Sequence, residues 1–262
     1  MRLSIITINY NNKSGLLRTI NSIIEQSVKE FEWIVIDGGS TDGSRELIDQ
    51  SDQYITYWCS ERDGGIYNAM NKGIRAAKGE YLLFMNSGDC LFSRHVIKDF
   101  LSWTYTHDFI YGYLINRESL KKKTCYSRDE LTAADFLNAS LPHQATFIRK
   151  ETFERFGMYD ESYKIVSDWK FFLEAIVFKN ASVKYVDVPV AIFDNEGISS
   201  GMNDKHREER EKVLHELFPE RILSDLYRAA SLKETVENRF CSRIYSLIYR
   251  LATCDNYKHG KG

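Results

Sequence analysis

The amino-acid sequence predicts an α/β fold in which a mostly parallel, Rossmann-like β-sheet is flanked by helices. In the first half of the chain, short apolar runs alternate with stretches of helical period, a pattern typical of βαβ units. The chain has 262 residues, of which 43% are hydrophobic and 27% charged, so it can bury a large core. We therefore expect one large α/β domain with a helical C-terminal extension.

Four strands are expected in the first half, each an apolar-rich run that ends in polar residues. Apolar side chains recur at helical spacing in residues 16–24, after the first strand, and in residues 66–77, before the fourth. Strands that alternate with helices pair in parallel, because each connection crosses over the sheet. The four runs are Leu3 to Ile8, Glu32 to Ile36, Ile55 to Cys59 and Glu80 to Met85.

The second half of the chain is less regular. From Asn203 onward the pattern becomes charged and helical, so we expect a boundary near Gly201, between a domain of residues 1–201 and an extension of residues 202–262. The remaining expected strands are Phe109 to Ile115, Ala145 to Arg149 and Val183 to Phe193, and the expected helices are Ala133 to Asn138 and Asp168 to Phe178.

Composition argues against several classes of protein. A net charge of −2 does not suggest a nucleic-acid-binding protein. The five cysteines are an odd number without a CxxC pair, which favours reduced thiols in a cytosolic compartment. The N-terminal apolar run is too short for a signal peptide, and no stretch approaches the ~20 apolar residues of a membrane span. A cytoplasmic protein is expected.

Polar residues follow all four strands of the first half. The ends carry Asn9 and Tyr10, then Asp37, then Asp63, and finally Asn86, Ser87 and Asp89. Ligands of open parallel sheets bind outside the carboxyl ends of the strands, so these residues are candidates for one site. Each end, taken singly, is also explained as a helix cap or a turn, and a cap is the better interpretation of Asp42.

The class of ligand follows from the motifs. The first strand is not followed by G-x-G-x-x-G, and the chain has no G-x-x-x-x-G-K-[ST] motif, which disfavours a dinucleotide fold and a P-loop. The remaining class of ligand is a nucleotide that is held by side chains and whose diphosphate is neutralised by a cation at Asp89. Magnesium suits such a site, because it needs only one or two protein carboxylates beside the substrate phosphates.

Five segments of the first 201 residues, in the right order, resemble one enzyme family. They are "SIITINYNN", "EWIVIDGGSTDGS", "GIYNAMNKGIRAAKGEYLLFMNSGD", "LPHQATFIRK" and "VSDWKFFLEA". The chain resembles family 2 nucleotide-sugar glycosyltransferases of the GT-A fold, and most of all bacterial enzymes of exopolysaccharide assembly such as the colanic acid transferases. The resemblance implies a donor half of about residues 1–115 and an acceptor and base half of about residues 116–201.

The resemblance also implies roles for the polar strand ends. Donor binding is assigned to Asn9, Tyr10, Asp37, Asp63, Asn86 and Ser87, and a divalent cation, Mn²⁺ or Mg²⁺, to Asp89 with His143 as a second, weaker candidate. The family's D-x-D metal motif is incomplete here, because Asn86 and Gly88 stand at its two positions and only Asp89 is left. The ion is therefore expected to arrive with the nucleotide.

Asp168 matches the family's catalytic base, which implies an inverting transfer from a nucleotide-diphosphate sugar, expected to be a UDP-sugar. Its acceptor would be a hydroxyl of a saccharide, lipid-linked, in bacterial surface polysaccharide assembly. The competing interpretation of Asp168 is an N-cap of the following helix. A catalytically degenerate nucleotide-sugar-binding module is the alternative function, and a nucleotidyltransferase is a more distant one. The processive polysaccharide synthases of this family carry a Q-x-x-R-W motif and membrane spans. The chain has neither, so the resemblance implies a single-addition enzyme.

Residues Arg239 to Arg250 form an amphipathic segment with a basic bias. Such a helix can lie on an anionic membrane, which would suit an enzyme at the inner face of the plasma membrane. Packing on the catalytic domain, or dimerisation through the C-terminal helices, explains the pattern equally well.

Overall fold

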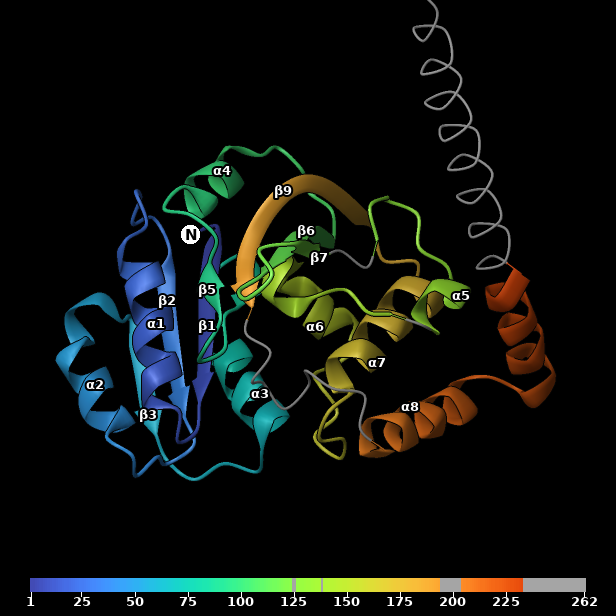
Figure 1. Ribbon diagram of the computed structural model, residues 1–262, viewed down its shortest axis with the longest axis horizontal. Helices are drawn as coiled ribbons and strands as arrows, with labels where there is room; N and C mark the ends of the chain where they lie inside the picture. Colours follow the sequence, from blue (N-terminus) through green and yellow to red (C-terminus); the bar gives the residue numbers. More distant parts are fainter. Residues whose placement is uncertain (124–125, 138, 194–203, 233–262) are drawn as a thin grey trace, which may run out of the picture.

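The computed structural model describes residues 1–123, 126–137, 139–193 and 204–232, and its centre is one curled β-sheet (Figure 1). The strand order is β3-β2-β1-β4-β8-β6-β9-β5, and β7 pairs with β6. The strands are β1 (Leu3–Asn9), β2 (Glu32–Asp37), β3 (Tyr57–Ser60), β4 (Tyr81–Phe84), β5 (Cys90–Leu91), β6 (Phe109–Asn116), β7 (Lys122–Lys123), β8 (Thr146–Arg149) and β9 (Val183–Phe193).

Helices cover both faces of the sheet. Helices α1, α2 and α4 pack on one face, and helices α3, α6, α7 and α8 pack on the other. The helices are α1 (Lys13–Ile24), α2 (Ser44–Gln50), α3 (Ile66–Ala76), α4 (Val96–Ser102), α5 (Ala133–Phe136), α6 (Glu151–Phe156), α7 (Ser167–Leu173) and α8 (Asp204–Leu217). Sequence analysis did not predict α4, α6, β5 or β7.

Strands β1, β2 and β4 are mostly apolar because both of their sides are buried, whereas the edge strand β3 is partly exposed. In β1, Ile5 belongs to the core beneath α1, and its neighbour Ile6 belongs to the core beneath α3. A Cβ at Gly73 of α3 would lie 2.4 Å from Cγ2 of Ile6, so the glycine permits the close approach of helix and strand. The parallel pairing of β3, β2, β1 and β4 agrees with the prediction.

The second half of the sheet is mixed. Strand β8 runs antiparallel to both β4 and β6, whereas β6 and β9 are parallel. Because β8 runs against β4, residues just before β8 lie near the carboxyl end of β4. This reversal brings part of the second half of the chain to the predicted site.

Helix α8 belongs to the segment that was predicted to form an extension beyond residue 201. Its Val213 and Leu214 are buried in the core that also contains α3, α6 and α7, and Figure 1 shows α8 beside α7. The amphipathic segment of residues 239–250 lies outside the described residues. No described helix is both long and apolar enough to cross a membrane. Of the cysteines, Cys59 and Cys90 are described, and both are free thiols.

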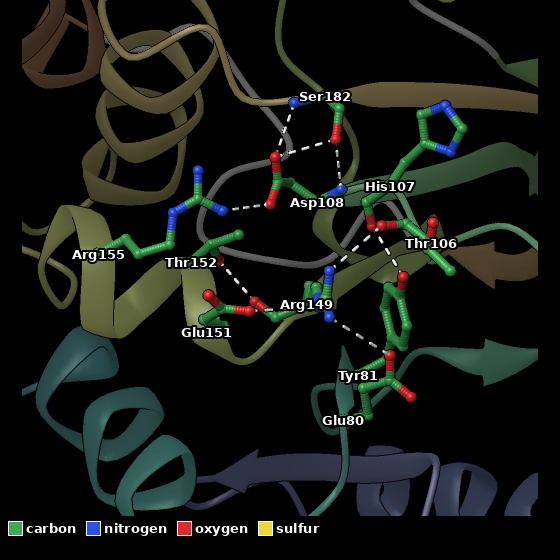
Figure 2. A network of polar contacts seen from close by, with 10 residues as sticks. All are labelled: Glu80, Tyr81, Thr106, His107, Asp108, Arg149, Glu151, Thr152, Arg155 and Ser182. Atoms are coloured by element: carbon green, nitrogen blue, oxygen red, sulfur yellow. Dashed lines mark hydrogen bonds and ion pairs between the residues drawn. The ribbon is translucent and has the colours of Figure 1, made fainter.

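Figure 2 shows a polar network at the end of the sheet opposite the predicted site. The Asp108 carboxylate accepts hydrogen bonds from the Ser182 amide at 2.8 Å, the Ser182 hydroxyl at 2.9 Å and Arg155 at 2.7 Å. The Tyr81 hydroxyl donates to the carbonyl of His107 at 2.8 Å. These contacts join the start of β4 to β6, and the start of β6 to β9 and α6.

We predict that Asp108→Ala lowers the free energy of unfolding by about 1–3 kcal/mol, because three hydrogen bonds to a buried, charged acceptor are lost. Burial would raise the pKa of Asp108, but hydrogen bonds from Ser182 and Arg155 hold it below its ordinary value of 3.8. The stabilisation is therefore present above that value and is lost as the pH falls through the folded pKa. Urea unfolding should show a lower free energy of unfolding for Asp108→Ala than for wild type at pH 7, and this difference should narrow below about pH 4.

The exposed Asp99 of α4 provides the control, and Asp99→Ala should leave the urea midpoint unchanged. An Asp108→Ala protein with the wild-type midpoint at pH 7 would contradict the prediction.

Candidate active site

Asp37 connects the carboxyl ends of β1, β2 and β3. One carboxylate oxygen accepts hydrogen bonds from Asn9 at 2.7 Å and from the Ser40 hydroxyl at 2.6 Å. The other accepts from the Ser60 hydroxyl at 2.6 Å and from the amides of Ser40 and Gly39 at 2.9 and 3.2 Å. Burial would raise the pKa of Asp37, but these bonds lower it below the ordinary value. Asp37 is fully buried and ionised, and it organises this end of the sheet.

Asp63 and Tyr10 lie beside the same strand ends, and both are next to Gly38. A Cβ at position 38 would lie 2.8 Å from an Asp63 carboxylate oxygen and 3.2 Å from the Tyr10 ring. The Tyr10 side chain is exposed, and Asp63 accepts a hydrogen bond from the Gly65 amide at 3.0 Å. Gly38 thus leaves the space that lets a carboxylate and an exposed ring sit together at the edge of the sheet.

Helix α1 holds the turn that follows β4. The Thr19 hydroxyl accepts from the Gly88 amide at 3.0 Å and donates to the Asp89 carbonyl at 2.7 Å. Asn12 caps α1 and donates from its amide to the Ser87 carbonyl at 3.1 Å. Gly88 has a φ of 110°, which favours glycine. These bonds set the position of the whole turn relative to β1.

His143 connects that turn to Asp168. Its Nδ1–H donates to Asp168 Oδ2 at 2.9 Å, and its Nε2 lies 3.2 Å from the Asn86 side-chain nitrogen. With the ring proton on Nδ1, Nε2 accepts from the Asn86 amide. This contact exists because His143 begins a short 3-10 helix, His143–Ala145, that leads into β8, and β8 runs antiparallel to β4.

Tyr67 of α3 holds the other oxygen of Asp168. Its hydroxyl lies 2.9 Å from Asp168 Oδ1 and 2.6 Å from the Ile165 carbonyl, so its proton is shared between two acceptors. Burial and the nearby Asp168 charge raise the pKa of Tyr67, which keeps it a donor. The carboxylate therefore has a fixed orientation, and its side chain is still 18% exposed.

Asp168 and His143 stabilise each other's charged forms. Burial would raise the pKa of Asp168, but the hydrogen bond and charge of His143, with the bond from Tyr67, lower it below the ordinary value. Burial would likewise lower the pKa of His143, but Asp168, together with the charge of Asp89, raises it. The result is a carboxylate anion at neutral pH, to which the Nδ1–H of His143 donates.

The interpretation of Asp168 as a helix cap is wrong. Helix α7 begins at Ser167, its N-cap is Val166, and no side chain makes a capping hydrogen bond there. Asp42 is not the expected N-cap of α2 either, because that position is Gly43 and no side chain makes a capping hydrogen bond there. Its carboxylate instead accepts from the amides of Lys13 and Ser44, at 2.8 and 3.0 Å. Asp42 thus connects the starts of α1 and α2.

Asp89 and Asn86 are the described residues that fit a divalent cation best. Asp89 is 8% exposed, and the Asn86 side-chain oxygen is buried without a hydrogen-bond partner among the described residues. Both nitrogens of His143 already contact protein atoms. In the described ranges, no group of three His, Cys, Asp or Glu side chains is arranged to hold a metal ion. A site here would need oxygens from a ligand.

Residues 4–161 match the sequence profile of glycosyl transferase family 2. The chain belongs to this family. An uncharacterized glycosyltransferase of Mycobacterium tuberculosis is 30% identical over 239 residues, which cover 88% of this chain and 83% of that protein. A PGL/p-HBAD biosynthesis glycosyltransferase of Mycobacterium bovis is 28% identical over 212 residues, covering 77% and 80% of the two chains.

Solved structures of two other proteins share the fold of this family 2 member. Residues 1–349 of S. aureus TarS in complex with UDP-GlcNAc superpose with a TM-score of 0.67 at 18% identity, covering 88% of this chain and 71% of TarS 1–349. In a second TarS structure with a longer chain, the match covers 88% of this chain and 43% of that TarS chain. A mannosyltransferase from Pyrobaculum calidifontis, solved with GDP-Man and Mn²⁺, gives a TM-score of 0.60 at 16% identity, covering 88% and 69%. The predicted GT-A fold is confirmed.

The structure brings the predicted site residues of this family 2 enzyme into two groups. Asn9, Tyr10, Asp37 and Asp63 gather at the ends of β1 to β3, and Asn86, Ser87, Asp89, His143 and Asp168 gather beyond β4. Sequence reasoning missed Tyr67, Thr19 and Gly38. Tyr67 was detectable in principle, because a tyrosine on the buried stripe of a helix needs a partner for its hydroxyl.

Proposed function

We propose that the protein is an inverting glycosyltransferase that moves a sugar from a UDP-sugar to a hydroxyl of a saccharide acceptor. The observation that carries this proposal is the chain of contacts Asn86–His143–Asp168–Tyr67. In this chain of contacts, His143 bonds to the ionised, partly exposed carboxylate of Asp168. The same histidine contacts Asn86, in the turn assigned to the donor diphosphate. The related structures solved with UDP-GlcNAc and with GDP-Man support a nucleotide-sugar donor.

In this proposal Asp168 is the general base. The acceptor oxygen attacks the anomeric carbon of the donor, and its proton passes to the Asp168 carboxylate. The bond from the anomeric carbon to the diphosphate oxygen breaks, and its electron pair leaves with UDP. His143 and Tyr67 keep the carboxylate in one orientation throughout. The low pKa of Asp168 keeps it unprotonated and ready to accept.

Asp89, with the side-chain oxygen of Asn86, would hold a divalent cation that arrives with the nucleotide. When bound, the cation would neutralise charge on the departing diphosphate. Oxygen donors of this kind suit Mg²⁺ and Mn²⁺. The structure solved with GDP-Man and Mn²⁺ is consistent with such an ion.

We also propose a lipid-linked saccharide as the acceptor, in bacterial surface polysaccharide assembly, with the enzyme at the inner face of the plasma membrane. The resemblance to exopolysaccharide transferases and the basic pattern of residues 239–250 support this assignment. The competing function is a nucleotide-sugar-binding module without catalysis, which the incomplete D-x-D motif favours. Release of UDP from a panel of UDP-sugars separates the two functions, because a binding module would bind UDP without turnover.

Asp63→Ala is expected to weaken UDP binding by about 1.5–3 kcal/mol, roughly tenfold or more in Kd, through loss of a hydrogen bond to a charged group. Gly38→Ala should weaken binding in the same direction, because its Cβ would displace the Asp63 carboxylate. Gly64→Ala is the matched control, since a Cβ there makes only ordinary contacts with Asn68. Calorimetry with UDP measures all three, and wild-type affinity in the folded Asp63 variant would refute the assignment.

Chelation should abolish UDP release, and added Mn²⁺ or Mg²⁺ should restore it. Asp89→Asn should raise the cation concentration needed for half-maximal rate at saturating UDP-sugar, because the site loses its carboxylate. The exposed Asp49 of α2 serves as the control, with Asp49→Asn expected to behave as wild type. Full turnover in excess chelator would overturn the cation assignment.

Asp168→Asn should slow UDP release by 10²- to 10⁴-fold, the usual loss when a general base is removed. UDP affinity should change little, because the base takes its proton only as the acceptor attacks. Single-turnover UDP release, calorimetry and thermal melting together check these expectations. A variant that melts earlier but turns over at near the wild-type rate would show that Asp168 has only a structural role.

A further inference from the structure

Helix α8 holds the segment that leads into the catalytic helix α7. The Glu209 carboxylate accepts hydrogen bonds from the backbone amides of Lys164, at 3.1 and 3.2 Å, and of Ile165, at 2.9 Å. A charged acceptor makes stronger hydrogen bonds to backbone donors than a neutral one does. The segment 164–165 is therefore tied to α8 immediately before α7 begins.

Ile165 is bonded on both of its sides. Its amide donates to Glu209, and its carbonyl accepts from Tyr67, whose hydroxyl also contacts Asp168. Helix α7 starts two residues later without a side-chain cap. The orientation of its first turn, which carries Asp168, therefore depends on how residues 164–166 are held.

Arg210 provides a second contact between α8 and this turn. Its guanidinium lies 4.3 Å from the ring centre of Trp169, the residue after Asp168. Arg210 and the Trp169 indole both donate to the Phe136 carbonyl, at 2.6 and 2.9 Å. A planar guanidinium stacked on an aromatic face resists lateral movement of the ring, so Trp169 is fixed from both its edge and its face.

The helix itself is firmly anchored. Val213 is fully buried, Leu214 is nearly so, and Glu216 accepts a hydrogen bond from the Tyr163 hydroxyl at 2.7 Å. Lys170, two residues after Asp168, pairs with Asp160 in the preceding loop at 2.7 Å and lies 3.9 Å from the Glu216 carboxylate of α8. The contacts of α8 thus reach the approach segment and the first turn of α7 from a rigid support.

We propose that α8 is a positioning element for the catalytic base, and that Glu209 and Arg210 are its positioning residues. Neither residue needs to touch the substrate, because each acts through Asp168. The inference rests on the proposed function of Asp168 and extends it to a helix beyond the part of the chain that matches the family profile. A displacement of about 1 Å in a catalytic group can cost on the order of 10²-fold in rate, so the effect should fall on kcat.

Glu209→Ala should lower kcat for UDP release by about ten- to a hundredfold, with KM and the calorimetric Kd for UDP within about twofold of wild type. Glu209→Gln keeps the shape and one acceptor oxygen, so its kcat should lie between those of wild type and Glu209→Ala. Glu208→Ala, an exposed neighbour on the same helix, is the control and should leave kcat unchanged. If the alanine variant does not fold, the glutamine variant carries the test, and a wild-type kcat there overturns the proposal.

A double-variant cycle distinguishes positioning from general destabilisation. If Glu209 acts through the base, adding Glu209→Ala to Asp168→Asn should leave the small residual rate of UDP release unchanged. If Glu209→Ala lowers the residual rate of Asp168→Asn by the same factor as it lowers the wild-type rate, the role of Glu209 is purely structural and the proposal is overturned. The proposed function fails separately, if Asp168→Asn alone turns over at near the wild-type rate. A slow Asp168→Asn with wild-type kcat in both Glu209 variants would reject the positioning role alone.

Discussion

The mostly buried carboxylate of Asp168 connects the parts of the site. A carboxylate that loses most of its water must be compensated by hydrogen bonds, and here the donors are Tyr67 and His143. The three residues come from α3, from the turn before β8 and from α7, which lie far apart in the sequence. The contacts of this one charge with both donors therefore require both halves of the sheet to be packed together.

Asp37 solves the same physical problem differently. Its donors all come from the ends of the first three strands and their loops, and it is wholly removed from solvent. Such a carboxylate has its accepting capacity filled by the protein, so it sets the shape of the surface that Tyr10 and Asp63 present. Asp168 has fewer partners and remains partly exposed. Because Asp37 accepts more hydrogen bonds from the protein than Asp168 does, Asp37 can serve as a scaffold, whereas Asp168 is left able to accept a proton.

The part of the fold that depends on local pattern was predictable from the sequence. Strand β9 has the predicted bounds, and the parallel order of β1 to β4 followed from strands alternating with helices, which also placed Asp37 and Asn86 at one edge. The contact of His143 with Asn86 was not predictable, because it depends on the antiparallel direction of β8, which no local pattern specifies. The sequence of α3 could indicate that the buried Tyr67 needs a partner for its hydroxyl, but only the tertiary structure shows that the partner is Asp168.

The boundary expected near residue 201 marks a change in pattern and not the end of the core. Helix α8 is rich in charged residues, which favours a solvated surface helix in a sequence-based interpretation. Several of these charges instead face inward and bond to backbone groups, as Glu209 does at Ile165 and Arg210 at Phe136. The amides of Lys164 and Ile165 precede α7, and the carbonyl of Phe136 ends α5, so these backbone groups need partners from elsewhere. A charged helix that supplies them is bound to the fold through polar contacts, in addition to its few buried apolar residues. For this reason a segment that contributes little to the apolar core can still control the geometry of the site.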